Sequence, residues 1–290
     1  MEKLLSLFGI ALIFLLSGCH NKPNPDEVKV LTLNLRYDNP GDSANAWPHR
    51  TSIVCDFIKE QKPDIFGMQE VLSHQYDQLD SALTEYCSIG EGRNDGARSG
   101  EMNPVFFKKD RFDLIRTITF WLSETPDVPG SMAWGASLPR IVTWVELAEK
   151  ESHEHFFYFN THFAHDSDSA RILSSKLLLA KVDSIASGFP FIVTGDFNMS
   201  TDSKGYSILT GPHESIPLFA DSYTISQKEP VGPVNTYNGW TDNMESGRID
   251  FIFVRKGMKV LNHITTIKKD HGVFISDHWP VMSTVLLKNN

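Results

Sequence analysis

Apolar residues recur along this chain with two different periods, and the period changes repeatedly between residues 28 and 290. Alternation at every second position, or a short unbroken apolar run, predicts a β-strand. Segments with this pattern are 28–37, 64–70, two strands inside 103–123 that meet near 108–110, a hairpin inside 141–163 with its turn at 148–154, and 189–198, 248–257, 259–267 and 278–288.

Apolar residues spaced three or four positions apart predict helices between these strands. In the segment 49–63, Ile53 and Phe57 lie on one helical face, and Pro63 ends the helix. Further helices are predicted from an N-cap at Ser73 to about Leu83, over about 167–186, and after Ser203.

The order of these elements predicts the fold class. Strand hairpins mixed with a few helices do not match the regular alternation of a doubly wound parallel sheet. A core of two sheets with helices outside fits this order better. We therefore expect an α+β fold, with one domain over 28–290, because no low-complexity linker or evident repeat interrupts that range.

The segment 189–198, FPFIVTGDFN, changes character at its end. An apolar run is followed by Gly195-Asp196-Phe197-Asn198, in which an acid and an amide lie two positions apart. Residues i and i+2 of a strand point to the same face. If the extended backbone continues, Asp196 and Asn198 project together at a strand end, where open α/β sheets keep their sites. Phe197 is then expected to pack into the core.

Polar side chains interrupt or follow other apolar runs in the same way. They are Asn34, Glu70, His162, Asp196, Asn198, Asp250, Asp277 and His278. Any one of them alone is typical of a cap, a turn or a satisfied core polar group. If the strands end at one edge of the core, however, the whole set converges on one cleft.

The chemistry of this set points to a divalent cation and a phosphate. Carboxylates with amides and no cysteine are the ligands of hard cations, which favours Mg²⁺ or Mn²⁺ over Zn²⁺. Neighbouring histidines can donate hydrogen bonds to an anionic oxygen. Hydrolysis at phosphorus requires these parts: a cation that neutralises charge, a base for water, and donors for the transition state.

The net charge of −9 limits the choice of partner. A protein that grips long nucleic acid carries a broad basic surface, which this composition does not suggest. A small phosphate substrate remains compatible, because one cation and a few arginines reverse the charge inside a cleft. Cys55 and Cys87 form no CxxC pair, which disfavours zinc and redox motifs. We expect both to be buried, and a disulfide between them is left open.

The first residues indicate export to the cell envelope. Lys3 precedes the apolar run LLSLFGIALIFLLSG, and Cys19 and the polar segment HNKPNPDE follow. A basic start, an apolar stretch and a small-residue processing site form a signal peptide, and about 15 apolar residues are short for a membrane span of roughly 20. LSGC resembles the bacterial lipobox. We expect residues 1–18 to be removed, Cys19 to be lipidated, and 19–27 to tether the protein in a bacterial envelope.

Six motifs, in this order and spacing, resemble the endonuclease/exonuclease/phosphatase superfamily. They are LNLRYD, GMQE, NTHF, TGDFN, RIDFIFV and SDHWPV, and they extend over nearly all of 28–288. The superfamily includes exonuclease III, deoxyribonuclease I, neutral sphingomyelinases and inositol polyphosphate 5-phosphatases. The resemblance implies a four-layer αββα sandwich of two mainly antiparallel sheets, with the site at one end of both sheets.

The resemblance also implies roles for the metal and water sites. Glu70 in GMQE is the expected principal metal ligand, and Asp277 in SDH is a second carboxylate on the metal side. Asp196 in GDFN is expected to orient or deprotonate the attacking water. Asn198 is expected to hold the phosphate or that water, and Asn34 to form a hydrogen bond to the same group.

Three further residues receive roles around the phosphate from the same resemblance. His278 is expected to contact the phosphoryl oxygens, with Asp250 orienting its ring. His162 matches a histidine placed to stabilise charge near the scissile group. Whether Asp196 or the Asp250–His278 pair is the general base is left open.

Substrate contacts are expected from Arg36, Arg93, Glu101 and Arg171. Some superfamily members carry an acid where this chain has Arg36, so Arg36 either clamps a phosphate oxygen or is a surface arginine. Arg93 and Glu101 lie in GRNDGARSGEMNP, which resembles a segment of one branch of small secreted members; a solvated charged loop is the alternative. Arg171 either neutralises a phosphate or pairs with Asp166 or Asp168.

Together these features predict a membrane-tethered, divalent-metal-dependent hydrolase of a small or exposed phosphodiester or phosphomonoester. Its expected partners are a phosphorylated small molecule, a lipid headgroup or a short nucleic acid, and the membrane through Cys19. No obligate protein partner is evident. A DNA or RNA nuclease of the same fold is the alternative, and a non-catalytic binding lipoprotein is a lower one.

Overall fold

Strands form where the apolar pattern predicts them, and they assemble into two six-stranded sheets. The computed structural model describes residues 24–211, 219–242, 244 and 247–288. The predicted signal peptide and Cys19 lie outside the described residues. Within the described ranges, no helix is long and apolar enough to cross a membrane.

The first sheet gathers strands from both ends of the chain, in the order β11-β14-β1-β2-β4-β3. Its strands are β1 (Glu27–Asn34), β2 (Ile65–Gln69), β3 (Tyr86–Ile89), β4 (Val105–Lys108), β11 (Lys259–Thr265) and β14 (Val281–Leu286). β1 and β2 are parallel, and the other neighbours in this sheet are antiparallel.

The second sheet is built from the middle of the chain, in the order β5-β6-β7-β8-β10-β9. Its strands are β5 (Phe112–Trp121), β6 (Ile141–Glu149), β7 (His155–His162), β8 (Phe191–Asp196), β9 (Phe219–Asp221) and β10 (Asp250–Arg255). β7 and β8 are parallel, and the remaining neighbours are antiparallel. Two short strands, β12 (Lys269–Asp270) and β13 (Val273–Phe274), pair with each other.

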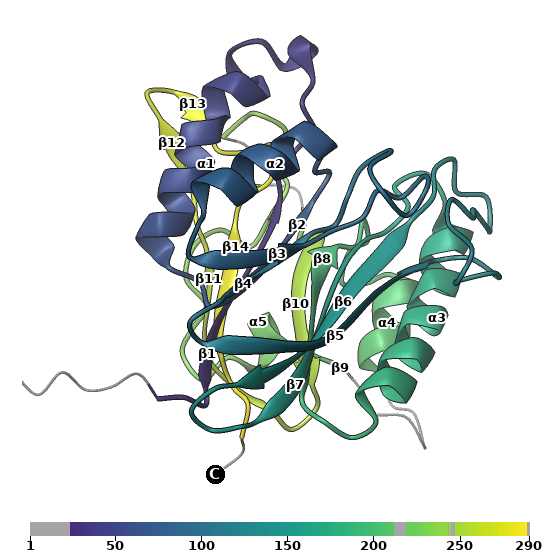
Figure 1. The fold of residues 1–290 in the computed structure, drawn as a ribbon. Helices are drawn as coiled ribbons and strands as arrows, with labels where there is room; N and C mark the ends of the chain where they lie inside the picture. Colours follow the sequence, from purple (N-terminus) through teal and green to yellow (C-terminus); the bar gives the residue numbers. More distant parts are fainter. Residues whose placement is uncertain (1–23, 212–218, 243, 245–246, 289–290) are drawn as a thin grey trace, which may run out of the picture.

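Helices cover the outer faces of the two sheets and complete four layers (Figure 1). On the first sheet lie α1 (Trp47–Gln61) and α2 (Ser73–Ala82), and on the second lie α3 (Asp168–Ala186) and α4 (Lys204–Thr210). A 3-10 helix (Pro40–Asn45) precedes α1, and the short α5 (Ser222–Ile225) follows β9. This is the αββα sandwich that the resemblance implied.

Three apolar clusters fill the three spaces between the layers. Phe57 of α1 packs with residues of the first sheet, and Leu178 of α3 packs with residues of the second. Between the sheets, Val30 belongs to the same cluster as Val145 and Ile252. Strands buried on both faces explain why their sequences read as nearly continuous apolar runs.

Two local predictions were wrong. Helix α2 begins at Ser73 itself, and the side chain of Gln75, rather than Ser73, accepts the N–H of Leu72 at 3.0 Å. Cys55 is buried as expected, but Cys87 is exposed because it lies on the edge strand β3 and points outward. Both thiols are free, so the disulfide that was left open does not form.

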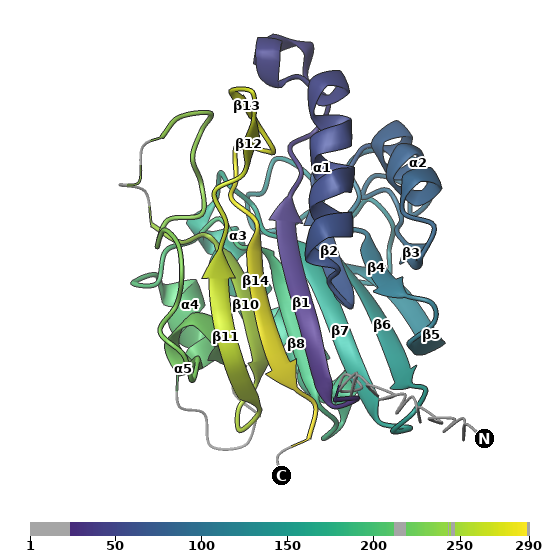
Figure 2. The same ribbon diagram turned by 90° about the vertical axis from the view of Figure 1, so that its left-hand side faces the viewer.

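Both sheets present the same edge to the predicted site. Strands β1, β2, β7 and β8 end at this edge, and the antiparallel β10 and β14 begin there. In Figure 2 it is the upper edge, toward which the arrowhead of β1 points. The polar residues that follow or precede these strands are therefore brought to one end of the sandwich.

Candidate active site

Strand register sets the predicted residues in two facing rows. In the second sheet, parallel pairing places His162 beside Asp196, and antiparallel pairing places Asp250 on the other side of Asp196. In the first sheet, Asn34 lies opposite Gln69, and Glu70 is the next residue. Because the sheets pack face to face, the two rows meet.

The rows line a cavity of about 610 Å³. The predicted residues that line it are Arg36, Glu70, Glu101, His162, Asp196, Asn198, Asp277 and His278. Asn34, Asp250 and Arg93 lie behind this lining and are bonded to it. The sequence-derived set therefore converges on one cleft, with the exception of Arg171.

Asn34 joins the two sheets at the floor of the cavity. Its buried Nδ2 donates to Glu70 Oε1 and to Asp196 Oδ2, both at 3.0 Å. Its Oδ1 accepts the backbone N–H of Arg36 at 2.9 Å. One amide thus holds a carboxylate from each sheet at a fixed separation.

Asp196 and Asn198 converge through a turn instead of through continued strand geometry. Strand β8 ends at Asp196, and Asn198 has a left-handed backbone with φ 49°. The backbone N–H of Asn198 donates to Asp196 Oδ1 at 2.9 Å, as in an Asx-turn. Phe197 is fully buried, as predicted. It lies in the apolar cluster between the second sheet and α3, where its ring packs against Phe163.

Gly195 is required for the close approach of two strands beneath this turn. A Cβ atom on Gly195 would lie 2.1 Å from the carbonyl oxygen of Thr161 on β7. No side chain fits at that distance. The glycine therefore permits the parallel pairing that sets His162 beside Asp196.

Left-handed backbone conformations recur at this edge. Arg36, Glu70 and Asn198 have φ values of 61°, 59° and 49°, and each follows the end of a strand by one or two residues. Such conformations cost non-glycine residues about 1–3 kcal/mol, and they cluster at functional sites. Here they lie at three strand ends that line one cavity.

His278 is held as a charged donor. Its Nδ1 lies 2.8 Å from Asp250 Oδ2, and its Nε2 lies 3.8 Å from Asp196 Oδ2. Burial acts to lower the pKa of His278, but the bonded Asp250 and the nearby Asp196 and Asp277 carboxylates raise it on balance. These carboxylates therefore favour the protonated form of the ring.

The pKa of Asp196 is also raised, which favours the neutral, protonated form of this acid. Burial, and then the neighbouring Asp250 carboxylate, raise the pKa of Asp196 above the usual range. His278 and the hydrogen bonds from Asn198 and Asn34 oppose this shift. A carboxylate with a raised pKa beside a cleft is suited to accepting a proton.

His162 is neutral and has a free donor. Burial, followed by the charges of Arg140 and Arg93, holds the pKa of His162 well below its ordinary value. Its Nε2 accepts from Asn198 Nδ2 at 3.0 Å, so the proton resides on Nδ1. In the described part of the chain, Nδ1 has no hydrogen-bond partner.

Two carboxylates on the first-sheet side fit a divalent cation. Asp277 is buried, and burial and the nearby Glu70 carboxylate raise its pKa. A cation bound between the two carboxylates would relieve the repulsion between them. Asp196, Asp250 and His278 also place donor atoms within 4.8 Å of one another. Nδ1 of His278 is already engaged by Asp250, and this carboxylate favours the protonated form of the ring. Glu70 and Asp277, with oxygen ligands alone, match Mg²⁺ or Mn²⁺ better.

The predicted arginines differ in position. Arg36 lines the cavity, but Asp42 engages its guanidinium in two hydrogen bonds of 2.9 and 3.0 Å. Arg171 lies outside the cavity, where it donates to the carbonyl of Ala164 at 2.8 Å and pairs with Asp168. The structure therefore shows the Asp168 pairing and does not bring Arg171 to the site.

Arg93 and Glu101 form one unit at the far side of the cavity. The guanidinium of Arg93 makes two hydrogen bonds to the Glu101 carboxylate, at 2.7 and 2.8 Å. Glu101 Oε2 lies 4.0 Å from Nδ1 of His162. Trp121 fixes the loop by donating from Nε1 to the carbonyl of Arg93 at 2.7 Å.

Sequence reasoning missed several lining residues: Tyr37, Leu138, Arg140, Tyr237 and Ile249. Arg140 directly precedes β6, and Ile249 directly precedes β10. The starts of antiparallel strands reach the same edge as the ends of β7 and β8, but a single arginine or isoleucine before an apolar run has no pattern that marks it as a cavity residue. Tyr237 lies in a loop, where no strand pattern identifies it.

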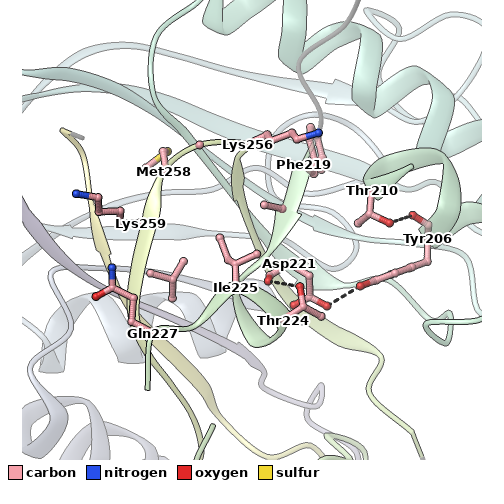
Figure 3. A pocket seen from close by; sticks show the side chains of 13 residues that line it. Tyr206, Thr210, Phe219, Asp221, Thr224, Ile225, Gln227, Lys256, Met258 and Lys259 are labelled. Atoms are coloured by element: carbon pink, nitrogen blue, oxygen red, sulfur yellow. Dashed lines mark hydrogen bonds between the residues drawn. The ribbon is translucent and has the colours of Figure 1, made fainter. Parts of the chain in front are cut away.

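A second cavity, of about 450 Å³, lies beside the edge strand β9 of the second sheet, and Figure 3 shows the side chains that line it. Its lining comes from α4, β9, α5 and the turn between β10 and β11. Asp221 accepts from Tyr206 at 2.9 Å and is also paired with Arg248. None of the predicted site residues lines this cavity, and its acid is already satisfied.

Comparison with known proteins gives concordant matches. The model of the Endonuclease/Exonuclease/phosphatase family matches residues 31–278. A crystal structure of an endonuclease/exonuclease/phosphatase from Bacteroides vulgatus is 37% identical, covers 90% of this chain and 99% of its own, and has a TM-score of 0.86.

Two further relatives are similar over almost their whole length. The mannosyl-6-phosphatase of Bacteroides thetaiotaomicron is 33% identical, with 89% of this chain and 99% of that chain covered and a TM-score of 0.82. An uncharacterised protein of Acanthamoeba polyphaga mimivirus is 30% identical over 275 residues, which cover 88% of this chain and 98% of the relative.

Proposed function

This chain belongs to the endonuclease/exonuclease/phosphatase family, and we propose that it is a divalent-metal-dependent hydrolase of phosphoesters. The observation that carries the proposal is the bridge made by Asn34 between Glu70 and Asp196. It sets a metal-side carboxylate and a water-side carboxylate on either side of one amide, beside the His278 ring.

Glu70 and Asp277 would hold the cation. When bound there, it would neutralise charge on a phosphate oxygen and polarise the phosphorus centre. Arg36 adds a positive charge beside this pair of carboxylates, because its Nε lies 3.8 Å from Asp277 Oδ2. Because Arg36 is also paired with Asp42, its contribution is to steady Asp277 rather than to clamp a phosphate.

Asp196 is the proposed general base. Because the Asp250 carboxylate favours the protonated form of His278, the Asp250–His278 pair is less suited than Asp196 to taking a proton from water. In the proposed step, a water oxygen bonds to phosphorus while the bond from phosphorus to the leaving oxygen breaks. Asp196 takes one proton from that water, and the leaving alcohol departs with a proton from solvent.

His278 is the proposed donor to the phosphoryl group, and Asn198 is proposed to hold the attacking water. Nε2 of His278 lies 3.8 Å from Asp196 Oδ2, and the ring is fixed in direction by Asp250. A preorganised donor of this kind stabilises charge that develops in the transition state. Asn198 lines the same cavity, and its Nδ2 donates to His162 and to the carbonyl of Phe163. Its Oδ1 is therefore left to accept a hydrogen bond from the attacking water.

A small phosphomonoester is the favoured substrate. The similar Bacteroides thetaiotaomicron protein is a mannosyl-6-phosphatase, and the two chains match over nearly their whole length. A cavity of about 610 Å³ has the size of a small-ligand site. The net charge of −9 disfavours long nucleic acid.

A substrate panel tests this proposal. The purified protein is assayed with p-nitrophenyl phosphate, bis(p-nitrophenyl) phosphate, hexose 6-phosphates, single-stranded DNA and RNA, with Mg²⁺, Mn²⁺ or EDTA. We expect hexose 6-phosphates to be hydrolysed fastest, and EDTA to abolish the activity. Turnover that persists in EDTA would overturn the mechanism, and a preference for DNA or RNA would favour the nuclease.

We also propose that the protein is a lipoprotein anchored through Cys19, because the lipobox-like LSGC directly follows an apolar run. In a bacterial host, the wild-type protein should incorporate radiolabelled palmitate and sediment with membranes. Cys19→Ser should do neither. Equal labelling of both proteins would overturn the lipid anchor.

A further inference from the structure

The cavity extends beyond the phosphate centre to a group of buried charges. Past His162, its wall is formed by Glu101 and Arg140, with Arg93 directly behind Glu101. Arg93 and Glu101 come from the loop that precedes β4, and Arg140 comes from the residue before β6. The proposed hydrolytic step uses none of these three.

Arg140 is buried, and two of its donor nitrogens are buried without a partner in the described residues. It is 5% exposed, and one of its nitrogens, Nη2, lies 2.9 Å from Nδ1 of His165. Among the residues the structure describes, its Nε and Nη1 have no hydrogen-bond partner. A buried polar group without a partner costs free energy, so native structures usually pair such groups. Because Arg140 lines the cavity, a bound molecule is the available partner.

Glu101 supplies acceptors beside these donors. Its two oxygens are held by Arg93, and each carboxylate oxygen can accept more than one hydrogen bond. Nδ1 of His162, 4.0 Å from Glu101, is another donor without a partner in the described residues. Donors without a partner and carboxylate acceptors therefore lie on the same wall.

We propose that Arg140 and Glu101 form a subsite for the hydroxyl groups of a sugar, next to the phosphate centre. A hydroxyl accepts one hydrogen bond and donates another. It can therefore accept from Arg140 while donating to Glu101, which no purely anionic group can do. This inference rests on the proposed hydrolase function, and it specifies the leaving group as polyhydroxylated.

The charges on this wall disfavour a second anion. Arg93 is neutralised by its paired hydrogen bonds to Glu101, which leaves Arg140 as the cation of this wall. An anion bound to Arg140 would also meet the Glu101 carboxylate. Leu138 adds an apolar surface to the same cavity, and the C–H face of a sugar can pack against it.

Binding measurements test the subsite without requiring turnover. Mannose 6-phosphate, inorganic phosphate and fructose 1,6-bisphosphate are titrated calorimetrically, with Mg²⁺, into the full chain carrying Asp196→Asn. The same titrations are made after adding Arg140→Met, Glu101→Gln or the matched control Arg116→Met. Arg116 is an exposed arginine on β5, away from the cavity.

We expect mannose 6-phosphate to bind about 10-fold or more tightly than inorganic phosphate, as charge-assisted hydrogen bonds allow. Arg140→Met and Glu101→Gln should each bring this ratio close to one, and Arg116→Met should leave it unchanged. Should Arg140→Met fail to fold, Glu101→Gln carries the same test.

Three results would overturn the subsite. They are a ratio near one before Arg140 is changed, a ratio that both variants preserve, and an Arg140-dependent preference for fructose 1,6-bisphosphate, which would indicate a second-anion site. Failure of the hydrolase function is seen separately, as absence of turnover by the wild-type chain in the substrate panel.

Discussion

Asp250 acts through His278. It lies behind the cavity, and its Oδ2 atom holds Nδ1 of His278 at 2.8 Å. Its negative charge is the main reason why the pKa of His278 rises despite burial. Asp250 is therefore a positioning residue that keeps the neighbouring ring oriented and protonated.

Asp250→Asn should therefore change the pH dependence of catalysis. Without the carboxylate, the pKa of His278 falls, so the donor is lost at a lower pH than in the wild type. We expect kcat to fall by about 10²-fold at neutral pH and the alkaline limb of the pH–rate profile to move to lower pH.

The control is Asp113→Asn, which removes an exposed carboxylate on β5. It should leave the profile in place. An unshifted alkaline limb in Asp250→Asn would show that His278 does not act as the charged donor.

For single residues, the sequence predicts which side chains belong to the site better than it predicts their backbone conformation. Glu70, Asp196 and His278 were placed in one cleft because each adjoins an apolar run, and the structure brings them together. The left-handed turn at Asn198 was not predictable, because a strand pattern does not report where the extended backbone stops. Arg140 was missed because one arginine before a strand has no distinguishing pattern.

Strand β11 carries a titratable group that affects stability. His263 is buried, and its Nδ1 lies 2.9 Å from Ser222 Oγ and 3.1 Å from Ser283 Oγ. Its Nε2 has no partner in the described ranges. Burial lowers the pKa of His263 to about 4. The folded protein therefore prefers this ring neutral.

Acid should weaken the fold through His263. The unfolded chain binds a proton near pH 6.5 and the folded chain near pH 4, so stability falls as pH drops through this window. This group alone should cost about 2 kcal/mol of unfolding free energy between pH 7 and pH 5. Urea unfolding of wild type and His263→Gln at both pH values measures the difference.

The control for this experiment is His271→Gln, because His271 is almost fully exposed. It should show the wild-type pH dependence. If His263→Gln loses as much stability as the wild type between pH 7 and pH 5, the ring is not held neutral by the fold.

The periodicity of apolar residues predicts the positions of helices and strands well where one face of the element is buried. Helix α3, predicted over about 167–186, spans Asp168–Ala186, with Ser167 accepting the N–H of Ala170 as its cap. The strand predicted to 37 ends at Asn34, because the chain turns into the cavity at Arg36. Apolar spacing marks burial, but it does not mark where a functional turn replaces the strand.

A buried polar layer joins the two sheets directly beneath the site. Asn160 of β7 donates to the carbonyls of Met68 and Pro104 at 2.7 and 3.0 Å, and accepts from Gln69 Nε2 at 2.7 Å. A Cβ atom on Gly67 would lie 2.3 Å from the amide of Asn160. Gly67 thus permits the approach that lets one amide span the sandwich.

Asn160→Ala should destabilise the whole molecule. It leaves two carbonyls and the Gln69 amide without this partner in a dry interior, which costs about 2–4 kcal/mol. Because Gln69 precedes Glu70, we also expect kcat to fall. Asn94→Ala, at an exposed loop, is the matched control. A loss below about 0.5 kcal/mol, as at surface sites, would show that the layer does not hold the sheets together.

At the scale of the whole molecule, the prediction of the fold rests on two kinds of sequence information. Element order argued for two sheets with helices outside, and motif resemblance supplied the four layers and the common edge. Periodicity alone does not pair β1 with β14 or β7 with β8, because those partners are chosen by contacts between distant segments. The wall formed by Arg140 and Glu101 likewise depends on where β6 begins relative to a loop far from it in sequence.

The central claim is tested most directly by Asp196→Asn, assayed with Mg²⁺ on whichever phosphoester the wild type hydrolyses fastest. The substitution keeps the shape of the side chain and removes the proton acceptor. We expect kcat to fall by about 10²-fold or more, and wild type in EDTA to lose activity as well. A variant that retains the wild-type kcat, with the same metal requirement, would contradict the assignment of Asp196 as the base.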